Sequence, residues 1–183
     1  MDSLLLLVAD PVITRALGAT LSVVLLVGAW QKLKDPVVFA AAVDNYRLLP
    51  ERLTPLVAGL LPLVELAAGG LLLFPDTAFV GGLLALFLLF VVTSAVGINL
   101  LRGHTRIDCG CGGLSGQPLS WALVVRNGLL MAMVGLAMQE SVGRSLVWAD
   151  YLTVGGAVLA LVGIYVSANQ LMTNAPLALA VRK

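Results

Sequence analysis

The sequence predicts an all-α fold, a polytopic membrane helix bundle. About five transmembrane helices are expected, a four-helix core plus one, with an interfacial amphipathic helix after the first span. Of the 183 residues, 60% are hydrophobic and only 11% are charged, and the mean hydropathy is +1.01. A soluble chain carries roughly 25% charged residues. The 11 basic residues nearly balance the 10 acidic ones, so no positive excess favours nucleic acid as a partner. The expected surroundings are the lipid bilayer.

The apolar runs are long enough to cross a bilayer and lie at about residues 12–30, 53–74, 79–101, 119–138 and 151–172. A tight turn at Pro75 joins the second and third runs, which therefore form a hairpin. The N-terminus has Asp2, Asp10 and Arg15 where a cleavable signal peptide has a basic start and an unbroken apolar run. No internal repeat or soluble domain is visible, so residues 1–183 are expected to form a single transmembrane domain.

The first long connection, about residues 31–52, predicts a short helix at the membrane interface. Asp35 followed by Pro36 is typical of a helix N-cap with proline at the first helical position. At helical spacing, one apolar face is formed by Phe39, Ala42, Val43, Tyr46 and Leu49. The stretch is too short to span the bilayer. Both a plain surface anchor and a lid over a site fit this pattern.

The second long connection, about residues 102–118, holds both cysteines and the only histidine of the chain, and it is rich in glycine. Because the second and third spans form a hairpin, the two long connections lie on the same face of the membrane. The interfacial helix and the cysteine-bearing connection are therefore expected to be neighbours.

Cys109 and Cys111 are separated only by Gly110. This spacing permits a disulfide only in a tight, distorted ring, and glycine best tolerates the dihedrals that such a ring needs. The disulfide would close almost no loop and would add little stability through chain entropy. Its strain would instead make it easy to reduce. We therefore expect the two cysteines to be catalytic, exchanging disulfides with a partner protein.

The residues just before the pair fit this chemistry. Arg102, His104 and Arg106 are cationic or can become so, and such neighbours favour the reactive thiolate. Asp108 opposes the thiolate or shuttles a proton to the leaving sulfur. Two other interpretations stay open: a metal site that includes His104, although a closed zinc site needs four ligands, and a pair of inert thiols. His104 alone also fits a solvated loop residue, and we expect no metal.

Four polar residues lie within the apolar runs: Arg15, Glu65, Arg126 and Asn127. Ionisable residues at membrane depth usually face the bundle interior and have a partner. Glu65 lies roughly 20 Å and Arg15 roughly 22 Å from the same face at 1.5 Å per residue, which predicts a Glu65–Arg15 pair. Arg126 lies roughly 11 Å below the cysteine connection, within reach of the redox site, Asp108 or a bound polar head group. Bundle packing without a catalytic role is the alternative for all four residues.

A set of motifs between Trp30 and Leu130 points to a known family. The motifs are Lys34-Asp35-Pro36, Phe39, Tyr46, Leu49-Pro50, Leu61-Pro62, Glu65, Leu101-Arg102-Gly103, residues 108–113 and Arg126-Asn127. The most specific of them is the Cys-Gly-Cys connection just ahead of a fourth span that contains an Arg-Asn pair. On these residues the chain resembles the MauE family of methylamine utilisation, membrane relatives of the DoxX group. Gly112 stands where many family members have an aromatic residue, which leaves the cysteines intact.

The resemblance implies a role in the maturation of methylamine dehydrogenase, whose small subunit carries many disulfides and a tryptophan-derived quinone. It also implies a thioredoxin-like periplasmic partner, MauD. The order of the spans looks like that of vitamin K epoxide reductase, which, like the membrane protein DsbB, passes electrons from thiols to a quinone. By this analogy a membrane quinone would bind near Arg126 and Asn127. The chain lacks a second cysteine pair, so it would contact its partner directly.

The resemblance and the charge pattern disagree about the membrane face. The family implies the bacterial plasma membrane with the cysteine connection in the periplasm. Positive residues usually mark the cytoplasmic side, and only Arg144 lies on the opposite face from the two long connections. The cations expected on their face are Lys32, Lys34, Arg47, Arg52, Arg102, Arg106, Arg182 and Lys183.

Three functions fit the sequence. The leading hypothesis is a membrane thiol–disulfide oxidoreductase that uses Cys109 and Cys111 to set the redox state of a thioredoxin-like partner. The second is a non-enzymatic membrane scaffold for the maturation machinery. The third is a small-solute carrier that uses Glu65 and Arg15.

Overall fold

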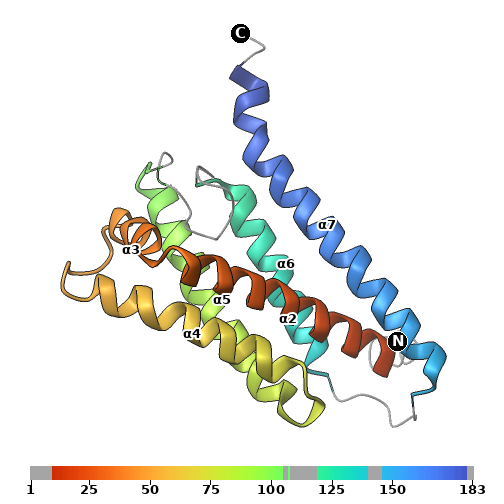
Figure 1. The fold of residues 1–183 in the computed structure, drawn as a ribbon. Coiled ribbons are helices and arrows are strands. Elements are labelled where there is room, and N and C mark those ends of the chain that lie inside the picture. The colour runs from red at the N-terminus through yellow and green to blue at the C-terminus, as the bar shows by residue number, and fades with distance from the viewer. Residues whose placement is uncertain (1–9, 105–106, 108–118, 140–145, 181–183) are drawn as a thin grey trace.

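A computed structural model describes residues 10–104, 107, 119–139 and 146–180, which fold into helices joined by turns (Figure 1). The helices are α2 (Pro11–Lys34), α3 (Pro36–Asn45), α4 (Thr54–Leu72), the 3-10 turn η1 (Pro75–Thr77), α5 (Ala78–Leu101), α6 (Trp121–Ala137) and α7 (Trp148–Ala180). No strand occurs within the described ranges. The all-α prediction is confirmed.

Four segments are long and apolar enough to cross a membrane, namely Pro11–Lys34, Thr54–Leu72, Pro75–Leu101 and Trp148–Asn174. The helix α6 has 17 residues, at the lower limit for a bilayer, and it packs beside α2 and α5. The chain is therefore a polytopic helical membrane protein, as predicted. Two boundaries differ most from the expectation: α2 continues past Trp30 to Lys34, and α7 continues beyond Met172. Hydropathy locates the apolar run, but a helix can continue into polar sequence.

The helix starts follow local sequence chemistry. The Oδ1 atom of Asp10 accepts a hydrogen bond from the backbone N–H of Val12 at 2.8 Å and caps α2. Asp35 stands at the predicted N-cap of α3, and its backbone carbonyl accepts from the N–H of Phe39 at 3.1 Å. The Asp35 side chain, however, makes no capping hydrogen bond. The position of the cap was predicted correctly, but the side-chain hydrogen bond typical of an N-cap is absent at Asp35.

The helices α2, α4, α5 and α6 form a four-helix core, and α7 packs mainly against α2 (Figure 1). Small residues let these backbones approach closely, as packing in lipid requires. The Ser22 hydroxyl donates to the carbonyl of Gly69 at 2.6 Å, which joins α2 to α4. A Cβ atom at Gly81 would lie 2.8 Å from the backbone nitrogen of Leu72, so the α4–α5 hairpin needs glycine there.

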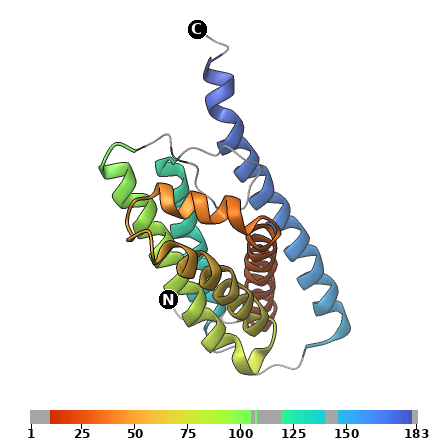
Figure 2. The ribbon, with the colours of Figure 1, turned by 60° about the vertical axis from the view of Figure 1, so that its left-hand side comes forward.

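The helix α3 lies across one end of the bundle (Figure 2) and packs on α4. Three residues of its predicted apolar face, Phe39, Ala42 and Tyr46, are buried. Val43 is half-buried, whereas Leu49 is exposed because it follows the end of the helix. The prediction of an amphipathic helix after the first span is confirmed.

Candidate functional site

Ile107 and Leu119, which lie on either side of the two cysteines in the sequence, are next to each other beside the end of α3. The backbone N–H of Leu119 donates to the carbonyl of Ile107 at 3.2 Å. Leu119 belongs to a buried cluster with Tyr46, and Ile107 packs against that cluster. The ends of the connection are thus next to the interfacial helix, as the topology predicted. The candidate residues Cys109, Cys111 and Asp108 lie outside the described residues, as does Arg106.

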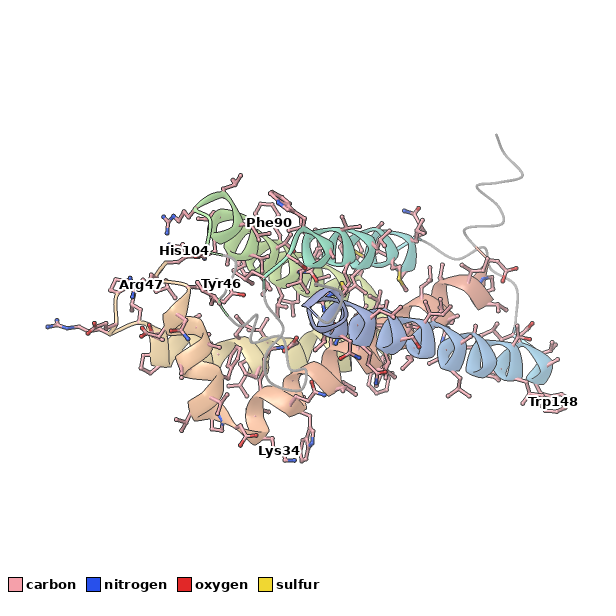
Figure 3. The ribbon with its side chains drawn as sticks, turned by 90° about the horizontal axis from the view of Figure 1, so that it is seen from above. Lys34, Tyr46, Arg47, Phe90, His104 and Trp148 are labelled. Atoms are coloured by element: carbon pink, nitrogen blue, oxygen red, sulfur yellow. The ribbon has the colours of Figure 1, made fainter. Side chains whose placement is uncertain are left out.

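Two of the predicted supporting residues, Arg102 and His104, follow directly after α5 at this end of the molecule. Figure 3 shows His104 near Tyr46 and Arg47, far from Trp148 at the other end. The backbone N–H of His104 donates to the carbonyl of the fully buried Asn99 at 3.0 Å. Its Nδ1 atom lies 3.3 Å from Oδ1 of Asn99. Arg102 and His104 are both exposed, so they are available to a docked partner.

Glu65 is buried at membrane depth, but its partner is Lys32 and not Arg15. The Nζ atom of Lys32 lies 2.9 Å from Oε1 and 2.6 Å from Oε2 of Glu65. Both side chains are less than 10% exposed. A Cβ atom at Gly28, one turn before Lys32, would lie 3.2 Å from Oε1 of Glu65. Glycine at this position leaves room for the carboxylate beside α2.

The predicted Glu65–Arg15 pair is therefore wrong. Arg15 is exposed near the opposite end of α2, in a separate cavity that also contains Gln139 and Tyr151. The depth estimate ended the first span at Trp30 and assigned Lys32 to the surface. In the structure α2 runs to Lys34, and side chains on a helix point back toward its N-terminus. Lys32 can consequently reach down into the bundle.

Arg126 and Asn127 form a polar network that joins α5, α6 and α7. Oδ1 of Asn127 accepts from Nε of Arg126 at 3.2 Å and from its NH2 nitrogen at 3.1 Å. The NH1 nitrogen donates to Oδ1 of Asn169 at 2.8 Å, and the guanidinium lies 5.8 Å from the ring centroid of Tyr165. The amide nitrogen of Asn127 donates to the Thr93 hydroxyl at 3.1 Å. Neutral groups therefore fix the direction of the Arg126 side chain.

Tyr165 and Asn169 were not predicted from the sequence. A usable signal was present, because Tyr165, Asn169 and Thr173 recur at four-residue intervals near the end of the last apolar run. Residues at this spacing share one face of a helix. Polar atoms on one face of a membrane helix need partners, and Arg126 supplies one of them.

A cavity of about 490 Å³ lies beneath α3 and reaches both polar groups. Its charged lining residues are Lys32, Glu65 and Arg126. The remaining lining is mostly apolar, with Phe39 and Tyr165 among the aromatic residues. The helices α4 and α5 converge at their hairpin and diverge toward α3 (Figure 1), and both contribute to the cavity wall. Within the described residues, Lys32–Glu65 is the ion pair, and Arg126 has no carboxylate partner.

The fold and this arrangement define a class: a small polytopic membrane protein with an interfacial helix, a cavity beneath it and a cysteine-bearing connection beside it. The family model for "Methylamine utilisation protein MauE" matches residues 10–140, and the chain belongs to the MauE family. The resemblance inferred from the sequence motifs is confirmed.

Individual relatives support the same assignment. The chain is 37% identical over 167 residues to the methylamine utilization protein MauE of Paracoccus denitrificans, covering 88% of each chain. It is 39% identical over 167 residues to that of Paracoccus versutus, with the same coverage. It is 41% identical over 134 residues to that of Methylorubrum extorquens, covering 72% of each chain. No solved structure matches the chain significantly.

Proposed function

We propose that this membrane protein of methylamine utilisation is a thiol–disulfide oxidoreductase that acts through Cys109 and Cys111. The observation that supports the proposal is the anchoring of their connection. The hydrogen bond between Leu119 and Ile107, and the packing of both residues near Tyr46, hold its two ends beside the interfacial helix. A short connection fixed at both ends can present a strained cysteine pair to a docked protein.

In one round of the proposed exchange, atoms and electrons balance between the two proteins, and no further reagent is needed. A thiolate of the partner attacks the Cys109–Cys111 disulfide and forms a mixed disulfide, which releases the other sulfur as a thiolate. The second partner thiolate then attacks the mixed disulfide. The partner leaves with a new disulfide, and Cys109 and Cys111 are left as a dithiol. The reverse reaction breaks and forms the same bonds.

The proposed partner is a thioredoxin-like protein of the MauD type, and the proposed client is the small subunit of methylamine dehydrogenase. The relatives' printed names place them in methylamine utilization. A thioredoxin-like protein supplies the pair of cysteines that the exchange needs. We place the protein in the bacterial plasma membrane with the cysteine connection on the periplasmic side.

The test is replacement of each cysteine by serine. Cys109→Ser and Cys111→Ser should each abolish maturation of the client dehydrogenase, whereas the control Ser120→Ala, at the start of α6, should leave it unchanged. The measurements are dehydrogenase activity in cell extracts and the amount of protein in the membrane fraction. A single-cysteine variant should also trap a mixed disulfide with the partner. Normal maturation without either thiol would contradict the proposal and leave a scaffold role.

The carrier hypothesis has lost its main support. It required Glu65 and Arg15 to act together. In the structure Glu65 of α4 pairs with Lys32 near the end of α2, whereas Arg15 lies near the start of α2 in a separate cavity.

A further inference from the structure

We propose that the cavity beneath α3 binds a lipid-soluble quinone, with its carbonyl-bearing ring between Arg126 and the Lys32–Glu65 pair and its chain leaving between α4 and α5. The proposal deepens the proposed function by naming an electron acceptor, and it rests on that function only for the electron transfer. Ring binding depends on the cavity alone and can be tested without either thiol.

The size and lining of the cavity favour an amphiphile. Its volume of about 490 Å³ falls among ligand sites, which span roughly 300–1,000 Å³. The wall is predominantly apolar, and its inner part shares Leu25, Leu89 and Leu130 with the buried core of the bundle. The charged residues of the lining come from α2, α4 and α6. Such a site suits a molecule with one small polar end and a long apolar end.

The charges of the lining indicate which polar group a ligand of this cavity carries. Lys32 is neutralised by Glu65, whereas Arg126 meets only carboxamide oxygens and an aromatic ring among the described residues. A guanidinium has five N–H donors, and the hydrogen bonds to Asn127 and Asn169 leave some of them for a ligand. A carbonyl oxygen can accept these donors without bringing in a charge.

A phospholipid head group fits the same cavity less well. Its phosphate would bring a full negative charge into a mostly apolar cavity in which Lys32 is already paired with Glu65. Burying a charge costs far more than burying a neutral carbonyl group. Four aromatic side chains, Phe39, Tyr46, Phe90 and Tyr165, also line the cavity. Aromatic faces stack well on a planar ring. These features favour a neutral, planar head.

The cavity extends to the ends of the cysteine connection. Tyr46 lines the cavity and belongs to the cluster that holds the ends of the cysteine connection. Closing the Cys109–Cys111 dithiol to a disulfide releases a pair of electrons and a pair of protons. Reduction of a quinone to a quinol takes up the same pair of electrons and the same pair of protons. The quinone would thereby regenerate the disulfide after each exchange.

The experiment measures binding of decylubiquinone to the purified full chain in phosphatidylcholine nanodiscs. Wild type should bind, and Arg126→Gln should weaken binding about tenfold, the loss expected for a hydrogen bond from a charged donor. Arg126→Lys should weaken it less. The matched control Arg15→Gln, which changes an arginine outside the cavity, should bind like wild type. The Cys109→Ser/Cys111→Ser variant should also bind like wild type, which separates this proposal from the proposed exchange.

Arg126 also joins α6 to α7, so its replacement could weaken binding by disturbing the fold. A second variant distinguishes loss of the site from such a disturbance. Ala95→Phe fills the cavity from α5 without changing any partner of Arg126, and it should abolish binding while the thermal unfolding temperature stays near that of wild type. Equal binding by wild type, Arg126→Gln and Ala95→Phe would overturn the proposal. So would a wild-type protein that retains a phospholipid in an Arg126-dependent manner and binds no decylubiquinone.

Discussion

A lysine and a glutamate buried together inside a membrane bundle stabilise it only as a pair. The Lys32 and Glu65 side chains are each less than 10% exposed and lie within hydrogen-bonding distance. Removing one partner leaves the other charge without compensation in a medium that solvates it poorly. Removing both leaves an apolar contact, whose cost is far smaller.

This contrast gives the first prediction at the residue scale. Lys32→Met should destabilise the protein by about 3–5 kcal/mol, whereas the double variant Lys32→Met/Glu65→Leu should recover most of that loss. The control is Lys34→Met, which removes an exposed lysine two positions further along the same helix. Denaturant unfolding in detergent micelles measures all three variants. Equal stability of Lys32→Met and Lys34→Met would show that the pair adds nothing.

The same residues show how far sequence reasoning reaches. Intramembrane charge marked Glu65 and Arg126 as interior residues, and both line the cavity. The partner of Glu65 could not be obtained from depth alone, because the estimate needed the exact end of the first helix. Lys32 looked like an interfacial cation until its flexible side chain was seen to reach back along α2. Long side chains uncouple the depth of a charge from the depth of its backbone.

At the scale of elements, α3 both covers the cavity and holds the cysteine connection. Tyr46, the residue after the helix, contributes to the cavity wall and to the cluster that Leu119 and Ile107 join. The sequence pattern left a surface anchor and a lid as alternatives for this helix. The buried Phe39 and Tyr46 both line the cavity, which favours the covering role. Periodicity identifies the apolar face of such a helix but not what lies beneath it.

The corresponding prediction concerns Tyr46→Ala. Loss of the ring should loosen both ends of the connection, raise the rate at which Cys109 and Cys111 react with a maleimide, and lower client maturation several-fold. Tyr151→Ala is the matched control, because Tyr151 is an exposed tyrosine near the other end of the bundle. Thiol alkylation kinetics on the reduced protein measure the effect. Identical kinetics for the two tyrosine variants would separate α3 from the cysteine chemistry.

At the scale of the whole molecule, hydropathy predicted the approximate positions and order of the apolar helices in the described part of the chain, because the membrane imposes a length on each apolar run. It predicted less well where α7 ends, since helical hydrogen bonds continue beyond the apolar stretch. Which helices touch was not predictable from hydropathy, because packing in lipid depends on small residues and polar contacts such as Ser22 with Gly69.

The last prediction concerns the orientation of the molecule. Among the described residues, the exposed cations at the α3 end are Lys34, Arg47, Arg52 and Arg102, and the one at the other end is Arg15. Lys32 is left out of this comparison of exposed cations, because it is buried and Glu65 neutralises it within the bundle. The positive-inside rule still favours a cytoplasmic α3 end, whereas exchange with a periplasmic partner requires the reverse.

A membrane-impermeant maleimide applied to intact spheroplasts, after mild reduction, decides between these orientations. We expect Cys109 and Cys111 to be labelled before the cells are permeabilised. The control is Trp148→Cys in a background without the native cysteines, because Trp148 is exposed at the opposite end of the molecule (Figure 3). That cysteine should be labelled only after permeabilisation. The opposite pattern would place the cysteine pair in the cytoplasm, where an exchange of disulfides with a periplasmic partner is impossible.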